Sequence, residues 1–141
     1  MHIVTVATKN EGYFNVLVES CRRNGGNLEV LGWNTEWKGF LYRIKLMNDY
    51  LQKLNDEEIV CFIDAYDVVI LQPFSKIETL FRKSGKKILL SRDVNTNIIT
   101  DSWLSFYYGK CKSYSINAGT YIGYVKYLKK MYNEIMKKYD K

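Results

Sequence analysis

The sequence contains one histidine, one proline and three cysteines in 141 residues. The histidine is His2, and the cysteines stand far apart, at positions 21, 61 and 111. No Cys/His metal site can be built from this set, and three scattered cysteines exclude a disulfide framework. We expect reduced, buried thiols. A single histidine also argues against hydrolases that depend on a Ser/His or Cys/His pair.

A secretory leader and a long apolar run are missing as well. The chain passes from Met1 directly into an alternating apolar segment, without a basic region, an apolar core or a cleavage site before it. The most apolar region, from Ile59 to Leu71, is interrupted by two aspartates, which a membrane helix would not carry at its centre. These absences predict a soluble protein without a membrane span, located in the cytoplasm.

The residues that are present suit one globular unit. Hydrophobic residues make up 47% of the chain, enough for a single core, so we expect one domain over residues 1–141. Lys and Arg (21) exceed Asp and Glu (15), a net charge of +6 that favours an anionic ligand without choosing between nucleic acid and a nucleotide diphosphate. The richness in Lys, Asn, Tyr and Ile is typical of AT-rich genomes, such as those of some large DNA viruses.

Strand patterns alternate with helix patterns along the chain. This alternation predicts an α/β fold with a mostly parallel sheet flanked by helices, and ligands in such sheets bind beyond the carboxyl ends of the strands. The final helix is preceded by a strand-turn-strand around Asn117, Ala118 and Gly119, and Ser75 is expected to cap the helix that it begins. The predicted strands are 2–7, 28–31, 58–63 and 87–90, and the predicted helices are 13–21, 40–54, 75–83 and 125–139.

The segment 62–68 (FIDAYDV) carries the strongest candidate chemistry. It delivers Asp64 and Asp67 from the end of a continuous apolar strand into the ligand-binding edge of the sheet. Mg²⁺ or Mn²⁺ is often held by one or two carboxylates together with diphosphate oxygens. The alternative is that Asp64 ends the strand and Asp67 forms a turn, as aspartates often do.

Four blocks of residues, in the same order, resemble the glycosyltransferase domain of procollagen lysyl hydroxylases and the related procollagen glycosyltransferases. The resemblance extends along nearly the whole chain. The blocks are 5–8 (TVAT) with 11–13 (EGY), 31–32 (LG) with 36–39 (EWKG), 64–68 (DAYDV), and 117–119 (NAG) with 122–123 (IG). The resemblance implies a GT-A type, Rossmann-like fold, a UDP-glucose or UDP-galactose donor, and manganese, or magnesium in its place.

The same resemblance implies roles for individual residues. Metal ligation falls to Asp64 and Asp67, contact with the sugar to Asp93, and the turn that approaches donor and acceptor to Asn117 and Gly119. We assign Asp93 and Asn117 as the catalytic candidates. The residues expected to bind the UDP-sugar are Val6, Ala7, Thr8, Trp37, Arg43, Lys45, Tyr66 and Gly119.

Each role has a structural alternative. Trp37, like Trp103, is also explained as a half-buried aromatic, and Arg43 or Lys45 as the solvated face of a helix. Asp93 could cap a turn. Gly119 could serve only a tight turn, because glycine accepts a positive φ.

The chain also departs from the family pattern. It lacks a glycine-rich insertion between Trp37 and Arg43, which predicts a shorter loop over the diphosphate. It ends at Lys141, about where the family continues toward a catalytic acidic residue and a metal-binding histidine. Either the protein is a minimal or degenerate member of the family, or water and diphosphate oxygens take the place of the missing metal ligand.

Three functions are compatible with these patterns. The first is transfer of a hexose from a UDP-sugar to a hydroxyl acceptor, such as hydroxylysine or galactosyl-hydroxylysine of a collagen-like protein. The second is an inactive nucleotide-sugar-binding relic that acts as a binding or partner module. The third, a nucleic-acid-binding domain, rests on charge and tyrosine content alone, and we expect no nucleic-acid partner.

Overall fold

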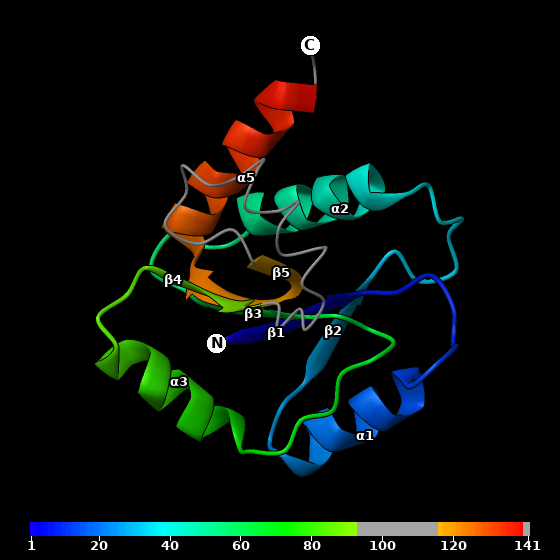
Figure 1. The fold of residues 1–141 in the computed structure, drawn as a ribbon, viewed down its shortest axis with the longest axis vertical. Coiled ribbons are helices and arrows are strands. Elements are labelled where there is room, and N and C mark those ends of the chain that lie inside the picture. Colours follow the sequence, from blue (N-terminus) through cyan, green and yellow to red (C-terminus); the bar gives the residue numbers. More distant parts are fainter. Residues whose placement is uncertain (93–115, 140–141) are drawn as a thin grey trace, which may run out of the picture.

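A computed structural model describes residues 1–92 and 116–139 of the chain. In this part, five strands form one sheet in the order β2-β1-β3-β5-β4 (Figure 1). The strands are β1 (His2–Val6), β2 (Leu28–Leu31), β3 (Ile59–Ile63), β4 (Ile88–Arg92) and β5 (Ile116–Tyr124). The helices are α1 (Phe14–Arg23), α2 (Phe40–Gln52), α3 (Phe74–Lys83) and α5 (Val125–Tyr139).

The direction of the strands confirms a mostly parallel sheet. β1 pairs in parallel with both β2 and β3, whereas β5 lies antiparallel to both β3 and β4. β4 therefore runs in the same direction as β1, β2 and β3, and β5 is the exception. As a result, the carboxyl ends of these four strands and the amino end of β5 meet at one edge of the sheet, which we call the carboxyl edge.

Helices cover both faces of the sheet and make three layers. α2 and α5 lie on one face, and α1 and α3 lie on the other, as Figure 1 shows. Each side has its own apolar core because the residues of β1 and β3 alternate between the two faces. The core under α2 and α5 includes Val4, Val60, Phe62, Met47, Leu51, Tyr121 and Leu128. The core under α1 and α3 includes Ile3, Cys61, Ile63, Leu17, Phe74, Phe81 and Ile122.

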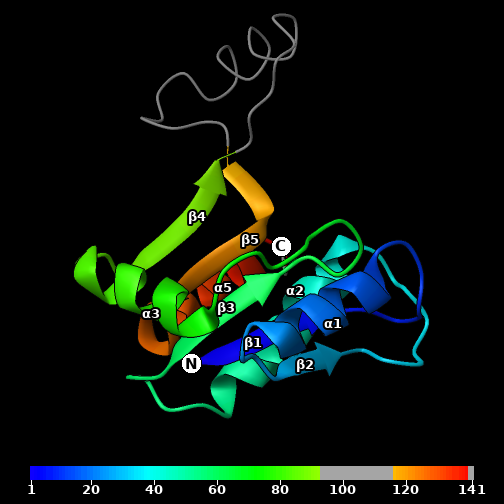
Figure 2. The ribbon, with the colours of Figure 1, turned by 90° about the horizontal axis from the view of Figure 1, so that it is seen from below.

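Two local predictions are wrong. β5 is one continuous strand from Ile116 to Tyr124, without the turn predicted around Asn117, and only its register against β4 shifts, between Leu90 and Ser91. β5 lies between β3 and β4 (Figure 2), and its extended course is held by pairing of Ile116 and Asn117 with β4 and of residues 120–124 with β3. Ser75 does not cap α3, because the helix begins one residue earlier, after Pro73, without a side-chain cap.

Among residues 1–92 and 116–139, no helix is both long and apolar enough to span a bilayer.

His2 joins two carboxylates and a tyrosine at the edge of the sheet where β1 begins. Its Nδ1 lies 3.1 Å from an oxygen of Glu29, and its Nε2 lies 3.0 Å from an oxygen of Glu58. The Tyr50 hydroxyl donates a 2.6 Å hydrogen bond to the same oxygen of Glu29. Partial burial lowers the pKa of His2, but the hydrogen bonds and charges of Glu58 and Glu29 outweigh it, so the pKa is raised above 6.5.

This raised pKa predicts how stability depends on pH. A group whose pKa is higher in the folded state stabilises that state fully below its unfolded pKa and loses this contribution as pH rises through the folded value. We expect the chain to lose stability between pH 6 and pH 8, and the His2→Gln variant to lose less. Urea unfolding at several pH values measures this difference. An identical pH dependence in the two proteins would show that the contacts of His2 with Glu29 and Glu58 do not cause the loss of stability.

Candidate functional site

A cavity of about 350 Å³ opens at the carboxyl edge of the sheet, between the loops after β1 and β3 and the start of α2. Its volume lies at the lower end of the range for small-molecule sites, about 300–1,000 Å³. Both charged and aromatic side chains line it. The lining residues are Val6, Thr8, Lys9, Glu11, Trp37, Phe40, Arg43, Asp64 and Tyr66, six of which the sequence had singled out.

Arg43, on α2, and Asp64, directly after β3, form an ion pair in this cavity. The distance from Arg43 Nη1 to Asp64 Oδ2 is 3.5 Å, and the other carboxylate oxygen accepts a 2.9 Å hydrogen bond from the backbone N–H of Ala65. The guanidinium group lies 5.4 Å from the ring centroid of Phe40 and 5.7 Å from that of Phe62. Because ring faces attract cations, the two aromatics hold Arg43 in a position where it faces Asp64.

Tyr66 ties the loop after β1 to the loop after β3. Its hydroxyl accepts a hydrogen bond from Thr8 N–H (3.2 Å) and donates one to the carbonyl of Lys9 (3.3 Å). Its own carbonyl accepts a 3.0 Å hydrogen bond from Tyr13 N–H. Gly12 permits this contact, because its φ is +54° and an added Cβ would lie 2.9 Å from the Tyr66 carbonyl oxygen. The floor of the cavity is thus built from two loops joined at several points.

Gly119 of β5 lies against Asp64. Its carbonyl accepts a 2.7 Å hydrogen bond from Asp64 N–H, and an added Cβ would lie 3.1 Å from Asp64 Oδ2. The φ of Gly119 is not in the left-handed region, so the close approach, and not a tight turn, explains this glycine. The side chain of Asn117 accepts a 2.7 Å hydrogen bond from Gly119 N–H and so shapes the strand next to Asp64.

Exposed aromatic side chains stand at the mouth of the cavity. Trp37 is 46% exposed and meets Phe40, 72% exposed, edge to face at 6.0 Å between ring centroids. Trp37 is therefore not a core residue. Its place at the mouth of the cavity fits a ligand-facing role, and its 46% exposure fits the half-buried alternative equally well. Phe40, Lys9 and Glu11 were not predicted as lining residues. Phe40 is the first residue of an amphipathic helix, and its position in the sequence predicts that it belongs to the apolar face that packs on the core.

Five of the predicted site residues that the structure describes do not line the cavity, and two of these, Asn117 and Gly119, lie on β5. Ala7 is buried and packs against Phe14 and Ala65, so it supports the cavity from behind. Lys45 is exposed on α2, because two residues along a helix correspond to a rotation of about 200° and place it away from Arg43. Asp67 is exposed in the loop after β3. Asp93, like Trp103, lies outside the described residues.

The donor atoms at this edge fit a hard cation only with help from a ligand. Within residues 1–92 and 116–139, no three or more His, Cys, Asp or Glu side chains come together in a group that could hold a metal. Asp64, one third exposed in the cavity, and Asp67, three residues further on, supply the available carboxylates. Mg²⁺ and Mn²⁺ sites of one or two carboxylates are usual where phosphate oxygens and water complete the shell, so Asp64, alone or with Asp67, would form such a site only together with a bound diphosphate.

The two cysteines in the described residues are free and buried, as expected. Burial raises the pKa of Cys21 to about 11, and burial together with the neighbouring Cys21 raises the pKa of Cys61 to about 12. Both remain neutral thiols at physiological pH and offer no nucleophile.

A three-layer α/β sheet with a cavity of charged and aromatic side chains at its carboxyl edge is typical of the doubly wound class, in which ligands bind at this edge. The family model described as the PLOD GT domain matches residues 1–141. The chain therefore belongs to this family of glycosyltransferase domains, and its architecture agrees with the GT-A-like fold expected from the sequence.

The chain is also similar to individual proteins that modify procollagen lysine. The chain is 36% identical over 77 residues to the multifunctional procollagen lysine hydroxylase and glycosyltransferase of Caenorhabditis elegans, covering 48% of this chain and 10% of that protein. It is 30% identical over 135 residues to the procollagen-lysine,2-oxoglutarate 5-dioxygenase of Drosophila melanogaster (86% of this chain, 18% of that protein). For the human procollagen-lysine,2-oxoglutarate 5-dioxygenase 2, identity is 23% over 142 residues (92% and 19%). The chain thus spans less than a fifth of the length of each of these relatives.

Proposed function

We propose that this domain transfers a hexose from UDP-glucose or UDP-galactose to a hydroxyl acceptor, with hydroxylysine or galactosyl-hydroxylysine of a collagen-like protein as the acceptor class. The observation that supports it is the Arg43–Asp64 pair in a cavity at the carboxyl edge of a glycosyltransferase-family sheet. The pair suits a ligand that carries a diphosphate together with a divalent cation, because Arg43 can bind the diphosphate and Asp64 the cation.

The roles of the residues follow from their positions around the cavity. In this proposal, Thr8, Val6 and Tyr66 bind the uridine, and Trp37 covers the donor from the mouth. Arg43 faces the diphosphate. Asn117, through its hydrogen bond to Gly119, orients the strand beside the reacting sugar, and Asp93 contacts the sugar itself.

Asp64 and Asp67 would hold the divalent cation, Mn²⁺ or Mg²⁺. When bound, such an ion neutralises charge on the departing UDP. The residues of the chain then have the separate task of positioning the diphosphate, through Arg43, and the donor ring.

A donor-turnover assay tests the proposed activity. We expect the purified chain with Mn²⁺ to release UDP from UDP-glucose or UDP-galactose, faster when a hydroxylysine-containing peptide is present. UDP release that is absent for both sugars, while UDP itself still binds, would favour the second candidate function below.

The second candidate is a nucleotide-sugar-binding module without turnover. The ion pair itself favours it, because Arg43 already neutralises Asp64 without any metal. Binding of UDP-sugar without hydrolysis or transfer would distinguish this module from the enzyme.

Arg43 provides a prediction in which two affinities move in opposite directions. In Arg43→Met, the apolar stem still packs on Phe40 and Phe62, but the charge is gone. We expect UDP binding to weaken by about tenfold to a hundredfold, since a charged hydrogen bond contributes about 1.5–3 kcal/mol. Mn²⁺ alone should bind more tightly, because Asp64 loses its competing cation.

Calorimetry for UDP and electron paramagnetic resonance for free Mn²⁺ measure the two affinities. Lys45→Met is the matched control, since it removes a positive charge from the same helix on an exposed position outside the cavity. Equal effects of the two substitutions would show that only the overall charge matters.

A further inference from the structure

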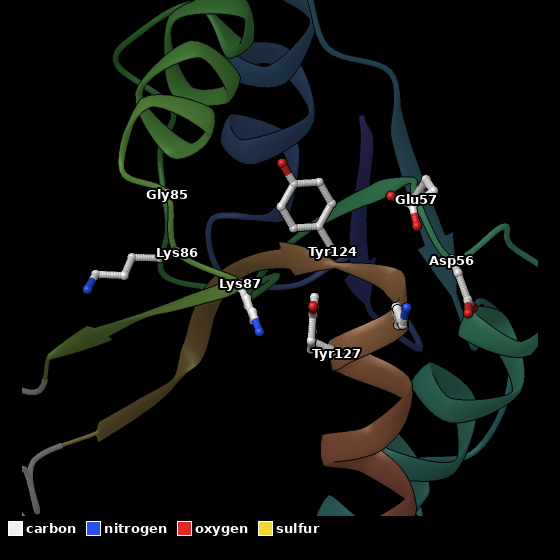
Figure 3. Close-up of a pocket in the computed structure, with 8 residues that line it drawn as sticks. Asp56, Glu57, Gly85, Lys86, Lys87, Tyr124 and Tyr127 are labelled. Atoms are coloured by element: carbon white, nitrogen blue, oxygen red, sulfur yellow. The ribbon is translucent and has the colours of Figure 1, made fainter.

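A second pocket, of about 290 Å³, lies at the opposite edge of the sheet, where β3 and β4 begin and β5 ends. β3 starts at Ile59 next to this pocket and ends at Ile63 next to the candidate donor cavity. At about 3.3 Å per residue, the four steps from Ile59 to Ile63 separate the two ends of the strand, and with them the two sites, by roughly 13 Å. No lining residue is shared between them. The pocket is lined by Asp56, Glu57, Gly85, Lys86, Lys87, Tyr124, Lys126 and Tyr127 (Figure 3).

Tyrosine rings and lysines come together in this pocket. The Lys87 ammonium lies 4.7 Å from the ring centroid of Tyr127, and that of Lys130 lies 6.0 Å from the same ring. Figure 3 shows Lys87 beside Tyr127 and Lys86 directed away from both tyrosine rings, so Lys86 belongs to the rim. Because the ring attracts both ammonium groups, Tyr127 gathers positive charge on one side of the pocket.

These positive charges lack acidic partners in the described part of the chain. Among residues 1–92 and 116–139, no salt bridge joins Lys86, Lys87 or Lys126 to a carboxylate. Of the two acidic lining residues, Asp56 is paired at 3.0 Å with Lys129, which lies outside the pocket, and Glu57 is exposed at its rim without a salt bridge among the described residues. The first turn of α5, which carries Lys126, contains no acidic residue, and its dipole adds positive potential here.

The backbone of the pocket is fixed by hydrogen bonds. Tyr124 N–H donates to the Lys87 carbonyl (3.1 Å), Val125 N–H to the Glu58 carbonyl (2.9 Å), and Lys126 N–H to the Asp56 carbonyl (3.0 Å). These bonds join the ends of β4 and β5, the start of α5 and the loop before β3. The lysines therefore project from a rigid frame, which lowers the entropy lost when they bind a ligand.

We propose that this pocket binds the phosphate group of a small phosphorylated ligand, with Lys87 and Lys126 as the ligating residues and Tyr127 as the residue that positions Lys87. Two ammonium groups without acidic partners match the two charges of a phosphate monoester. The pocket is too small for a folded partner. It is also independent of the proposed transferase reaction, because it lies at the opposite edge of the sheet from the donor cavity and shares no lining residue with it.

Nuclear magnetic resonance titration of the ¹⁵N-labelled chain with inorganic phosphate, at constant ionic strength, tests this site. We expect saturable shifts at the amides of residues 86–87 and 124–127, and none in a matched titration with chloride. Lys87→Gln combined with Lys126→Gln should weaken the binding roughly tenfold or more, since both charge-assisted contacts are lost. Both side chains are exposed, so the variant should fold.

Two control variants distinguish phosphate binding in this pocket from nonspecific attraction of phosphate to a positively charged protein. Lys138→Gln removes an equally exposed lysine from the far end of α5, and Asp64→Ala alters the donor cavity. Both should leave phosphate binding unchanged. Shifts that never saturate, an equal loss in Lys138→Gln, or shifts centred on Thr8 and Asp64 would each overturn the proposal.

Discussion

Replacing Phe62 by alanine is expected to lower the free energy of unfolding by about 3–5 kcal/mol, the range for a large aromatic removed from a packed core. Phe62 is 1% exposed in the middle of β3 and stacks on Tyr121 with ring centroids 5.0 Å apart. The neighbouring helices α2 and α5 are fixed by the rest of the sheet, so the space can close only in part. Urea unfolding followed by circular dichroism measures the loss.

The ring of Phe62 also contacts the guanidinium group of Arg43, so the Phe62→Ala substitution should change the position of Arg43 in the cavity. UDP binding, where the folded variant can still be measured, should weaken as well. Leu71→Ala is the control, because this leucine is 80% exposed and should change stability by no more than about 0.5 kcal/mol. A loss below about 1.5 kcal/mol for Phe62→Ala would mean that the core repacks far more easily than its burial implies.

Replacing Asp64 by alanine is expected to weaken Mn²⁺-dependent UDP binding by roughly a hundredfold, which corresponds to about 3 kcal/mol. Under the proposed function, Asp64 is the carboxylate that lies in the cavity, whereas Asp67 lies in the exposed loop beside it. Asp67→Ala should therefore have the smaller effect. Stability should change little in either variant, because Asp64 is partly exposed and its ion pair with Arg43 is 3.5 Å long.

Asp56, at the opposite edge of the sheet, provides a control for Asp64→Ala. Asp56→Ala removes a more exposed carboxylate (53% against 35% for Asp64) that pairs with Lys129 and lies outside the donor cavity. It should leave UDP binding intact. If Asp56→Ala weakened UDP binding as much as Asp64→Ala, net charge and not a local site would explain the effect.

Much of this fold was predictable because short-range patterns agree with the tertiary structure. The apolar run that ends at Asp64 predicted a buried strand that delivers a carboxylate to the carboxyl edge, and β3 confirms it. The bounds predicted for β2 and α5 are also those observed. The direction of β5 was not predictable, since the pairing of a strand with distant partners leaves little trace in its own residues.

The details of the cavity were less accessible from sequence. Arg43 and Lys45 carry the same charge two residues apart, and only the rotation of α2 decides which one faces Asp64. Gly119 suggested a turn, whereas its actual reason is a contact with a residue 55 positions earlier in the chain. The grouping of lysines around Tyr127 was not visible in the sequence, because two segments that lie far apart in the chain, the residues before β4 and the start of α5, bring them together.

Titration of UDP into the unmodified chain, with and without Mn²⁺, decides whether the carboxyl-edge cavity is a nucleotide-sugar site. We predict binding that requires Mn²⁺ and is lost when Asp64 and Asp67 are both replaced by alanine. Equal binding with and without the metal, or no binding by the folded chain under either condition, would contradict the assignment of this cavity to a metal-bound UDP-sugar.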